Sequence, residues 1–176
     1  MPPSPPAPAD PTSPPLSAVP EAGLRSALGS FATGVTLLTA MAADGRPFGL
    51  TINSFNSVSL DPPLILWSLS LKSPKITAFR EAHHYAVNVL AAGQAALSAR
   101  FASADPDRFS ALPFRCGHTG APLIEGCCAW FECAHAAQYP GGDHLIFLGK
   151  IEHFCRGAAS EPLVFFDGDY RALEKR

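Results

Sequence analysis

Residues 130–154 read WFECAHAAQYPGGDHLIFLGKIEHF, a pattern that predicts a hairpin of two long strands. The first strand runs over 130–139 and ends at a Pro-Gly-Gly-Asp turn, residues 140–143. In the returning strand, 145–154, apolar residues alternate with more polar ones, as in a half-buried strand; they are Leu145, Phe147 and Ile151. The longest strands of the chain are therefore expected to be antiparallel neighbours.

Further strands are expected outside this hairpin. Segments rich in β-branched and aromatic residues favour strands, and they occupy 35–39, 48–53, 64–70, 85–90 and 162–166. An Asp-Gly pair at residues 44–45 is a strong hairpin signal between the first two of these.

Three helices are expected between the strands. Residues 20–34 begin with proline and end with glycine, which suit the two ends of a helix. The second helix covers 73–82, with Ser73 as its N-cap and Pro74 as its first helical residue. The third covers 94–102, where alanine is frequent.

About seven strands, joined mainly by turns, argue against a Rossmann sheet, which needs regular crossover helices. The glycine motif of dinucleotide-binding folds, G-x-G-x-x-G, does not occur in the chain. We therefore expect a mainly β fold, a closed antiparallel barrel with a few peripheral helices.

The length of 176 residues points to one domain rather than two. Hydrophobic residues make up 47% of the chain and charged residues only 16%, which leaves little polar cover for the surface. Because exposed apolar patches usually mark interfaces, this composition predicts a large subunit interface. Proline dominates residues 1–20, which we expect to form a disordered tail ahead of the domain, residues 21–176.

The net charge is −2 and basic residues form no stripe, so nucleic acid is not an expected partner. No apolar run reaches the ~18 residues of a membrane span, and the N-terminus lacks the regions of a signal peptide. The five cysteines are then expected to be reduced thiols in the cytoplasm. Their spacing matches no zinc motif, so no metal site is predicted.

Residues 49–59, Gly-Leu-Thr-Ile-Asn-Ser-Phe-Asn-Ser-Val-Ser, are polar for a segment with apolar surroundings. Side chains such as Thr51, Asn53 and Ser54 both donate and accept hydrogen bonds. This property suits the edge of a heterocycle that carries carbonyl and N–H groups. The alternative is a polar, turn-rich strand that faces water.

Two further stretches are candidates for binding. Residues 68–74 combine serines with Lys72 at the end of a strand and the start of a helix, which suits a phosphate. The alternative is an ordinary helix cap beside a solvated lysine. Residues 141–144 place His144 after a glycine turn, where it either faces a cleft or lies in water.

These stretches, in this order, resemble the flavin reductase family that supplies reduced flavin to two-component monooxygenases. The most diagnostic runs are GLTINSFNSVSLDPP at 49–63 and GDHLIFLG at 142–149. Shorter matches are FATGV at 31–35, KSP at 72–74, YAVNVL at 85–90, RFA at 100–102, GAPL at 120–123, WFEC at 130–133 and PLVFFDGDY at 162–170.

The resemblance implies a Greek-key split β-barrel that binds FMN at the interface of a homodimer. It implies that the isoalloxazine edge is lined by Thr51, Asn53 and Ser54. The ribityl chain and phosphate are then held by Ser68, Ser70, Lys72 and Ser73. The resemblance also implies that Arg100 and Phe101 lie near the flavin. It places His144 against the nicotinamide and Tyr170 where the pocket closes.

The expected reaction is hydride transfer from NADH or NADPH to FMN or FAD, and the reduced flavin passes to a partner monooxygenase. The cofactors carry this chemistry, while the protein supplies orientation and hydrogen-bond donors. Two alternatives remain open. In one, the same fold reduces a corrinoid or a ferric chelate; in the other, the chain binds flavin without enzyme activity.

Overall fold

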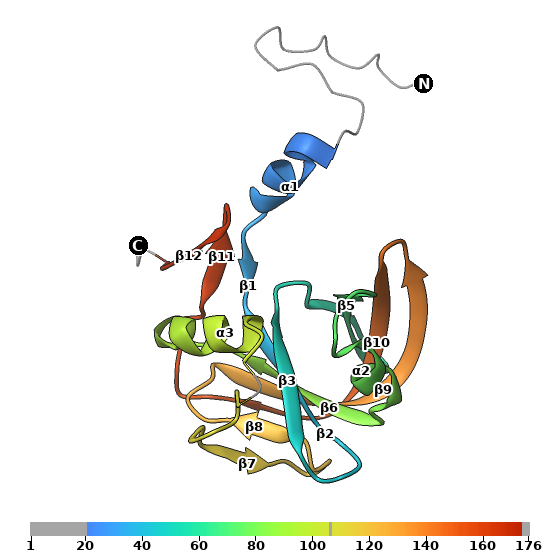
Figure 1. Cartoon of the computed structure of the whole chain (residues 1–176). Coiled ribbons are helices and arrows are strands. Elements are labelled where there is room, and N and C mark those ends of the chain that lie inside the picture. The colour runs from blue at the N-terminus through green and yellow to red at the C-terminus, as the bar shows by residue number, and fades with distance from the viewer. Residues whose placement is uncertain (1–20, 106, 174–176) are drawn as a thin grey trace, which may run out of the picture.

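The computed structural model describes residues 21–105 and 107–173, so the tail expected over 1–20 lies outside the described residues. A seven-stranded antiparallel sheet with the order β3-β2-β6-β9-β10-β5-β4 dominates the fold (Figure 1). Its strands are β2 (Thr36–Met41), β3 (Pro47–Ile52), β4 (Asn56–Leu60), β5 (Pro63–Ser70), β6 (His84–Val89), β9 (Ala129–Gly141) and β10 (His144–Arg156). The mainly β, antiparallel fold is thus confirmed.

The β9–β10 hairpin is the longest feature of the sheet, as its sequence predicts. Each strand has 13 residues, and they pair along their whole length, from His144 opposite Gly141 to Arg156 opposite Ala129. β10 also pairs with β5, and β9 also pairs with β6. The hairpin therefore joins the two halves of the sheet.

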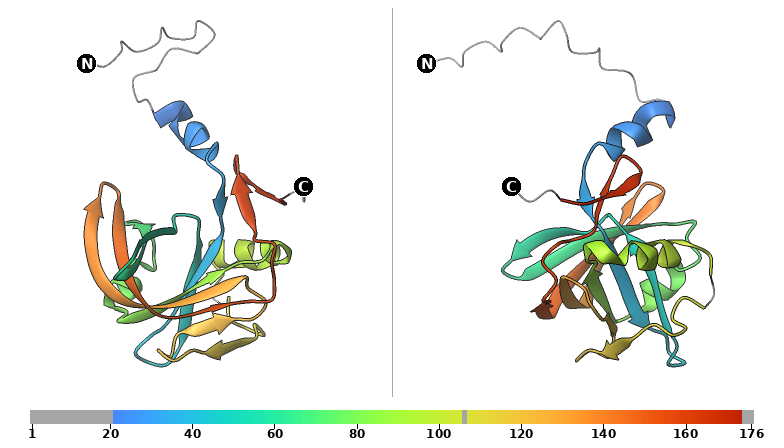
Figure 2. Two further views of the ribbon diagram at one scale, coloured as in Figure 1. Left: turned by 180° about the vertical axis from the view of Figure 1, so that it is seen from behind. Right: turned by 90° about the vertical axis from the view of Figure 1, so that its left-hand side faces the viewer.

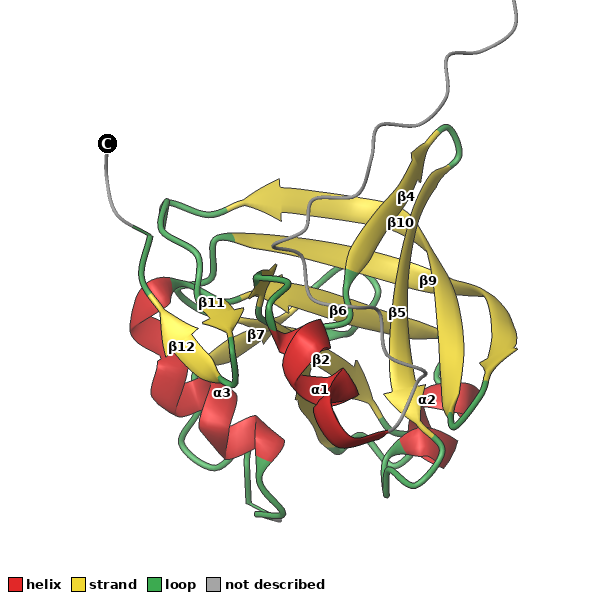
Figure 3. Cartoon of the chain, turned by 90° about the horizontal axis from the view of Figure 1, so that it is seen from above, coloured by secondary structure: helices red, strands yellow, loops and turns green. Residues whose placement is uncertain are grey.

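The two edge strands, β3 and β4, lie at opposite ends of the sheet, yet only residues 53–55 connect them. Because a chain spans at most ~3.6 Å per residue, the end of β3 and the start of β4 lie within about 14 Å. The sheet must therefore curl until its edges meet at this corner. Figure 3 shows the curled sheet from above. No β3–β4 ladder forms among the described residues, so the expected closure of the barrel by hydrogen bonds is not made.

Two small sheets complete the fold. β1 (Thr33–Gly34), β11 (Val164–Phe166) and β12 (Asp169–Arg171) form one of them, and β7 (Phe114–Cys116) pairs with β8 (Pro122–Ile124) in the other. Of these short strands, the sequence predicted only β11. It also did not predict β4 of the large sheet. β4 was missed because the polar–apolar alternation of Ser57 to Leu60 is short and its residues are mostly exposed.

The three helices are α1 (Glu21–Gly29), α2 (Ile76–Glu81) and α3 (Ala95–Ala102). The first ends before the predicted Gly34, because residues 33–34 pair with β11. The prediction of Ser73 as a helix cap is wrong. Its hydroxyl accepts the N–H of Lys75 at 3.3 Å in a turn ahead of α2, and Lys75 is the N-cap residue. No helix of the described residues is long and apolar enough to span a membrane.

An aromatic cluster fills the main core. Trp67 stacks on Phe147 with ring centroids 4.0 Å apart, and it meets Phe79 of α2 and Tyr85 of β6 edge-on. All four side chains are fully buried. Such aromatic pairs contribute about 0.5–1.5 kcal/mol each beyond the burial of their area. They hold β5, β6 and β10 in the curled arrangement.

A second core lies under α3. Phe101 packs there with apolar residues of the neighbouring strands and loops, among them Leu37, Leu90 and Ile124. Beside it, the buried amide of Asn88 donates to the carbonyl of Leu37 and accepts the N–H of Ile124, both at 2.8 Å. The packing of Phe101 holds α3 on this core, next to the candidate site.

Candidate active site

The corner between β3 and β4 is fixed to β5 by a pair of hydrogen bonds. The hydroxyl of Ser54 donates to the carbonyl of Ser68 at 2.9 Å and accepts the Ser68 N–H at 3.1 Å. The first two polar stretches that the sequence singled out are thus in direct contact. The same two bonds commit the Ser54 hydroxyl to the backbone.

The second and third polar stretches also lie side by side. Ser70 stands opposite His144 in the β5–β10 ladder, and the N–H of Leu71 donates to the carbonyl of Asp143 at 2.9 Å. Lys72 follows directly and is exposed. Residues far apart in the sequence are thereby gathered at one end of β5.

The side chains of Asp143 and His144 are hydrogen-bonded, with Nδ1 of the imidazole 2.7 Å from the carboxylate. The hydrogen bond to His144 lowers the pKa of Asp143, and the charges of His144 and Lys72 add to the effect. An ionised carboxylate accepts the Nδ1 proton, which leaves Nε2 of His144 available for a ligand.

A cavity of about 180 Å³ opens next to the corner. It lies between β3, α3 and the β11–β12 hairpin, and it is mostly apolar. Its lining residues are Val35, Thr51, Ile52, Asn53, Ser98, Ala102, Phe165 and Tyr170. Three of the residues that the sequence predicted for a site, Thr51, Asn53 and Tyr170, therefore come together here.

Ser98 is the residue of this cavity that sequence reasoning missed. It is fully buried, its carbonyl accepts the hydroxyl of Thr51 at 2.8 Å, and its own hydroxyl accepts that of Tyr170 at 2.7 Å. Ser98 thus joins β3, α3 and β12 around the cavity. Its place in an alanine-rich helix gave no signal, because the spacing alone does not show which face of α3 is buried.

The polar groups of the cavity fit a planar heterocycle. The exposed side chain of Asn53 forms no hydrogen bond within the described residues, so its amide is free to donate and accept. Thr51 donates its only hydroxyl proton to Ser98, so its oxygen is left as an acceptor. Apolar walls with a few such groups are typical of small-molecule sites.

The remaining predicted residues lie outside the cavity. Ser68, Ser70, Lys72, Ser73 and His144 surround the neighbouring end of β5, beyond Ser54. Arg100 donates to two carbonyls of the following loop, those of Asp107 and Ser110, at 2.7 Å each. Phe101 is buried in the core. The side chains of Arg100 and Phe101, both in α3, are therefore engaged with the following loop and the core instead of lining the cavity.

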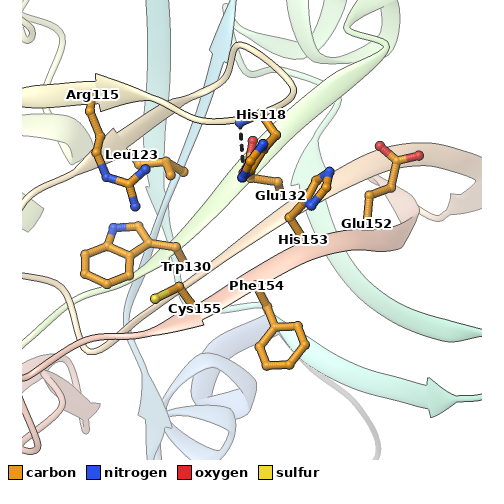
Figure 4. Close-up of a pocket in the computed structure, with 9 residues that line it drawn as sticks. All are labelled: Arg115, His118, Leu123, Trp130, Glu132, Glu152, His153, Phe154 and Cys155. Carbon is orange, nitrogen blue, oxygen red and sulfur yellow. Dashed lines mark hydrogen bonds between the residues drawn. The ribbon is translucent and has the colours of Figure 1, made fainter.

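A larger cavity of about 330 Å³ lies elsewhere, between the β7–β8 hairpin and the far end of β9–β10 (Figure 4). None of the sequence-predicted site residues lines it. The rings of His118 and His153 stack there with centroids 4.5 Å apart. No three His, Cys, Asp or Glu side chains of the described residues form a group suited to a metal ion.

The carboxylate of Glu132, which is buried at that cavity, already accepts hydrogen bonds from its own chain. It accepts the N–H and hydroxyl of Thr119 at 2.8 Å each and the N–H of His118 at 3.2 Å. Burial raises the pKa of Glu132, but these hydrogen bonds outweigh it, and the pKa is lowered. Glu132 thus holds a turn, and size alone does not make this cavity the active site.

Comparisons with known proteins identify the family of the chain. The family described as "Flavin reductase like domain" matches residues 28–174. The chain is 45% identical over 152 residues to FMN reductase (NADH) SmoA of Agrobacterium fabrum, with 86% of each chain covered. It is 44% identical to the reductase component of a flavin-dependent trigonelline monooxygenase of Acinetobacter baylyi, covering 84% of this chain but only 47% of that longer protein.

A solved structure extends this likeness to the fold. NADH:FAD oxidoreductase SgcE6 of Streptomyces globisporus C-1027, in complex with NAD and FAD fragments, superposes with a TM-score of 0.83 at 39% identity. The match covers 88% of this chain and 93% of the SgcE6 chain. By the family match and by these relatives, the chain belongs to the flavin reductase-like domain family.

Proposed function

We propose that this chain is an NADH-dependent flavin reductase that passes reduced flavin to a partner monooxygenase. The observation that carries the proposal is the cavity beside residues 53–55, where apolar walls meet the polar groups of Thr51 and Asn53. The relatives of the chain include an FMN reductase (NADH) and the reductase component of a monooxygenase. A bound flavin supplies the hydride acceptor, and the protein binds and orients the two cofactors.

Four cavity residues have a task in this proposal. The oxygen of Thr51 accepts a ring N–H, and the amide of Asn53 bonds to ring carbonyl and N–H groups. Tyr170 and Phe165, whose rings meet edge-on at 5.8 Å, form an apolar wall. Among the described residues, no charged side chain lines the cavity. Neutral donors stabilise the charge of a reduced ring while still allowing it to leave, which a flavin supplier needs.

We assign the residues beyond Ser54 to the rest of the cofactors. Ser68, Ser70, Lys72 and Ser73 hold the ribityl chain and phosphate, and His144 contacts the nicotinamide through Nε2. This assignment rests on the contacts that gather these residues at one end of β5. It does not rest on a helix N-terminus, because α2 has only six residues and begins after Ser73.

We further propose a homodimer with the flavin at the subunit interface. The cavity of about 180 Å³ is smaller than the roughly 300–1,000 Å³ of pockets that enclose small molecules. A second copy supplies the missing wall.

We also propose that the flavin reductase domain is residues 21–176, without the proline-rich segment. The five free thiols fit a protein of the reducing cytoplasm.

The direct test is oxidation of NADH by the purified protein, with and without added FMN, FAD or riboflavin. We expect turnover that saturates with free flavin. Turnover that is faster with a corrinoid or ferric chelate than with any flavin contradicts the proposal. Flavin binding without NADH oxidation also contradicts it, because the chain is then a binding module.

Breaking the Ser98–Tyr170 hydrogen bond should loosen the flavin site. We expect Tyr170→Phe and Ser98→Ala each to weaken flavin binding by about 0.5–1.5 kcal/mol, up to roughly tenfold in Kd. The double variant should lose little more, because both changes remove the same bond. Quenching of flavin fluorescence measures Kd, and Tyr139→Phe, an exposed tyrosine on β9, is the control. Additive losses, or an equal loss in the control, contradict this role.

Lys72 should distinguish FMN from riboflavin, because only FMN carries a phosphate. We expect Lys72→Ala to weaken the binding of FMN by about 1 kcal/mol, roughly fivefold in Kd, and to leave the Kd for riboflavin unchanged. Lys75→Ala, a neighbouring lysine at the start of α2, provides the control. An equal loss for both flavins removes Lys72 from the phosphate site.

His144 should act on the nicotinamide rather than on the flavin. We expect His144→Ala to raise the KM for NADH several-fold, because a positioned ligand contact is lost, with flavin Kd unchanged. Steady-state kinetics and flavin titration measure the two effects, and His153→Ala in the larger cavity is the control. A collapse of flavin affinity in His144→Ala shows that the nicotinamide assignment is wrong.

A further inference from the structure

The larger cavity, between the β7–β8 hairpin and the far end of β9–β10, has no role in the proposed function. It shares no lining residue with the candidate flavin cavity. Figures 1 and 2 show the β7–β8 hairpin (yellow) at the end of the molecule away from α1 (blue) and the β11–β12 hairpin (red). The cavity volume of about 330 Å³ lies within the roughly 300–1,000 Å³ of small-molecule pockets. The cavity is therefore large enough for a ligand of its own.

One side of this cavity is apolar and fixed. Leu123 of β8 is buried there. Trp130 of β9 is held in place because its indole N–H donates to the carbonyl of Ile124 at 2.7 Å. The ring of Phe154 at the rim is 76% exposed, so its own chain leaves it largely uncovered. Indole and phenyl surfaces of this kind favour an aromatic ligand, which stacks on them and covers their apolar area.

The turn that carries His118 is held by Glu132. The carboxylate of Glu132 accepts the backbone N–H of His118 at 3.2 Å and that of Thr119 at 2.8 Å. A Cβ atom at Gly117 would overlap this carboxylate, so a glycine is needed for the turn to close on it. The turn places the ring of His118 on that of His153, and the stacked pair lines another part of the cavity. Both sides of the cavity are thus formed before any ligand binds.

Of the arginine and the two glutamates in the lining, only Arg115 has no partner among the described residues. Glu152 pairs with His84 at 3.4 Å, and Glu132 is engaged with the turn. The guanidinium of Arg115 forms no hydrogen bond or ion pair with any described residue. Figure 4 shows Arg115 beside Leu123 and Trp130. A planar guanidinium pairs best with a carboxylate, through two parallel N–H···O bonds.

The neighbouring carboxylates limit the charge that a ligand can carry. Glu132 and Glu152 line the same cavity as Arg115, so a doubly charged phosphate monoester would face two like charges with one free cation. A carboxylate carries a single charge, which one guanidinium neutralises. The lining therefore suits one carboxylate next to an aromatic ring.

We propose that this cavity is a binding site for a small aromatic monocarboxylate, separate from the flavin site. Arg115 binds the carboxylate, and the rings of Trp130 and Phe154 contact the aromatic ring of the ligand. The inference goes beyond the proposed function, because neither the flavin nor the nicotinamide takes part in it.

The test measures the Kd for benzoate by isothermal titration calorimetry on the full chain, with and without saturating FMN. Benzyl alcohol provides the ring without the carboxylate, and cyclohexanecarboxylate provides the carboxylate without the aromatic ring. The main variant is Arg115→Gln, and its matched control is Arg156→Gln. Arg156 is also exposed and directly follows the cavity residue Cys155, but it does not line the cavity.

A second variant, Phe154→Ser, tests the aromatic contact. Arg115 and Phe154 are both exposed, so neither substitution removes core packing, and far-UV circular dichroism checks the fold. No NADH is present in these titrations, so their outcome does not depend on the reductase activity.

We expect benzoate to bind about tenfold more tightly than benzyl alcohol and several-fold more tightly than cyclohexanecarboxylate. Arg115→Gln should raise the Kd for benzoate about tenfold or more, and Phe154→Ser several-fold, while Arg156→Gln and saturating FMN leave it unchanged. The proposal is overturned if the wild type does not bind benzoate, or if both arginine variants lose affinity equally. Benzyl alcohol that binds as tightly as benzoate also overturns it. Displacement of benzoate by FMN does so as well, because the probe then occupies the flavin site.

Discussion

Three residues, Asn53 to Phe55, connect the two edge strands of a seven-stranded sheet, and this short connection constrains everything around it. Strands that stand at opposite ends of the sheet are forced to meet at one corner. The sheet therefore curls, and its edges diverge away from the corner. Ser54 holds the corner against β5 with two hydrogen bonds. The candidate cavity lies beside this point, where β3, α3 and the C-terminal hairpin converge.

The remaining structure keeps that corner rigid and leaves its neighbourhood open. The stacked Trp67–Phe147 pair and the long β9–β10 hairpin maintain the curl. Around the cavity, Ser98 fixes β3 and β12 through one carbonyl and one hydroxyl. A rigid frame with neutral polar groups suits a protein that binds flavin long enough to reduce it and then releases it. The open mouth of the cavity agrees with the second copy that the proposed function calls for.

The sequence predicted those parts of the fold in which local pattern and tertiary structure agree. The β9–β10 hairpin was predictable because apolar alternation and the glycine turn both mark it. β4 was not, because its alternation covers only four residues of a serine-rich segment, and its pairing with β5 depends on the corner. Ser73 failed as a helix cap because its hydroxyl serves an earlier turn. In each failure a contact with residues outside the local pattern decided the outcome.

The candidate site follows the same rule. Thr51, Asn53 and Tyr170 were found through their motifs, and the fold brings them to one cavity. Ser98 was missed because burial of one face of α3 is a tertiary property. Arg100 and Phe101 share the α3 segment with Ser98, yet they face the following loop and the core. A motif thus identifies the right segment without showing which of its side chains face the ligand.

The central claim is that the flavin ring occupies the cavity beside the 53–55 corner. A crystal structure of the protein grown with FMN tests this claim most directly. The account predicts ring density against Thr51, Asn53 and Tyr170, with the Ser98–Tyr170 hydrogen bond intact. Density in the larger cavity lined by Arg115 and His153, with the corner cavity empty, would contradict it.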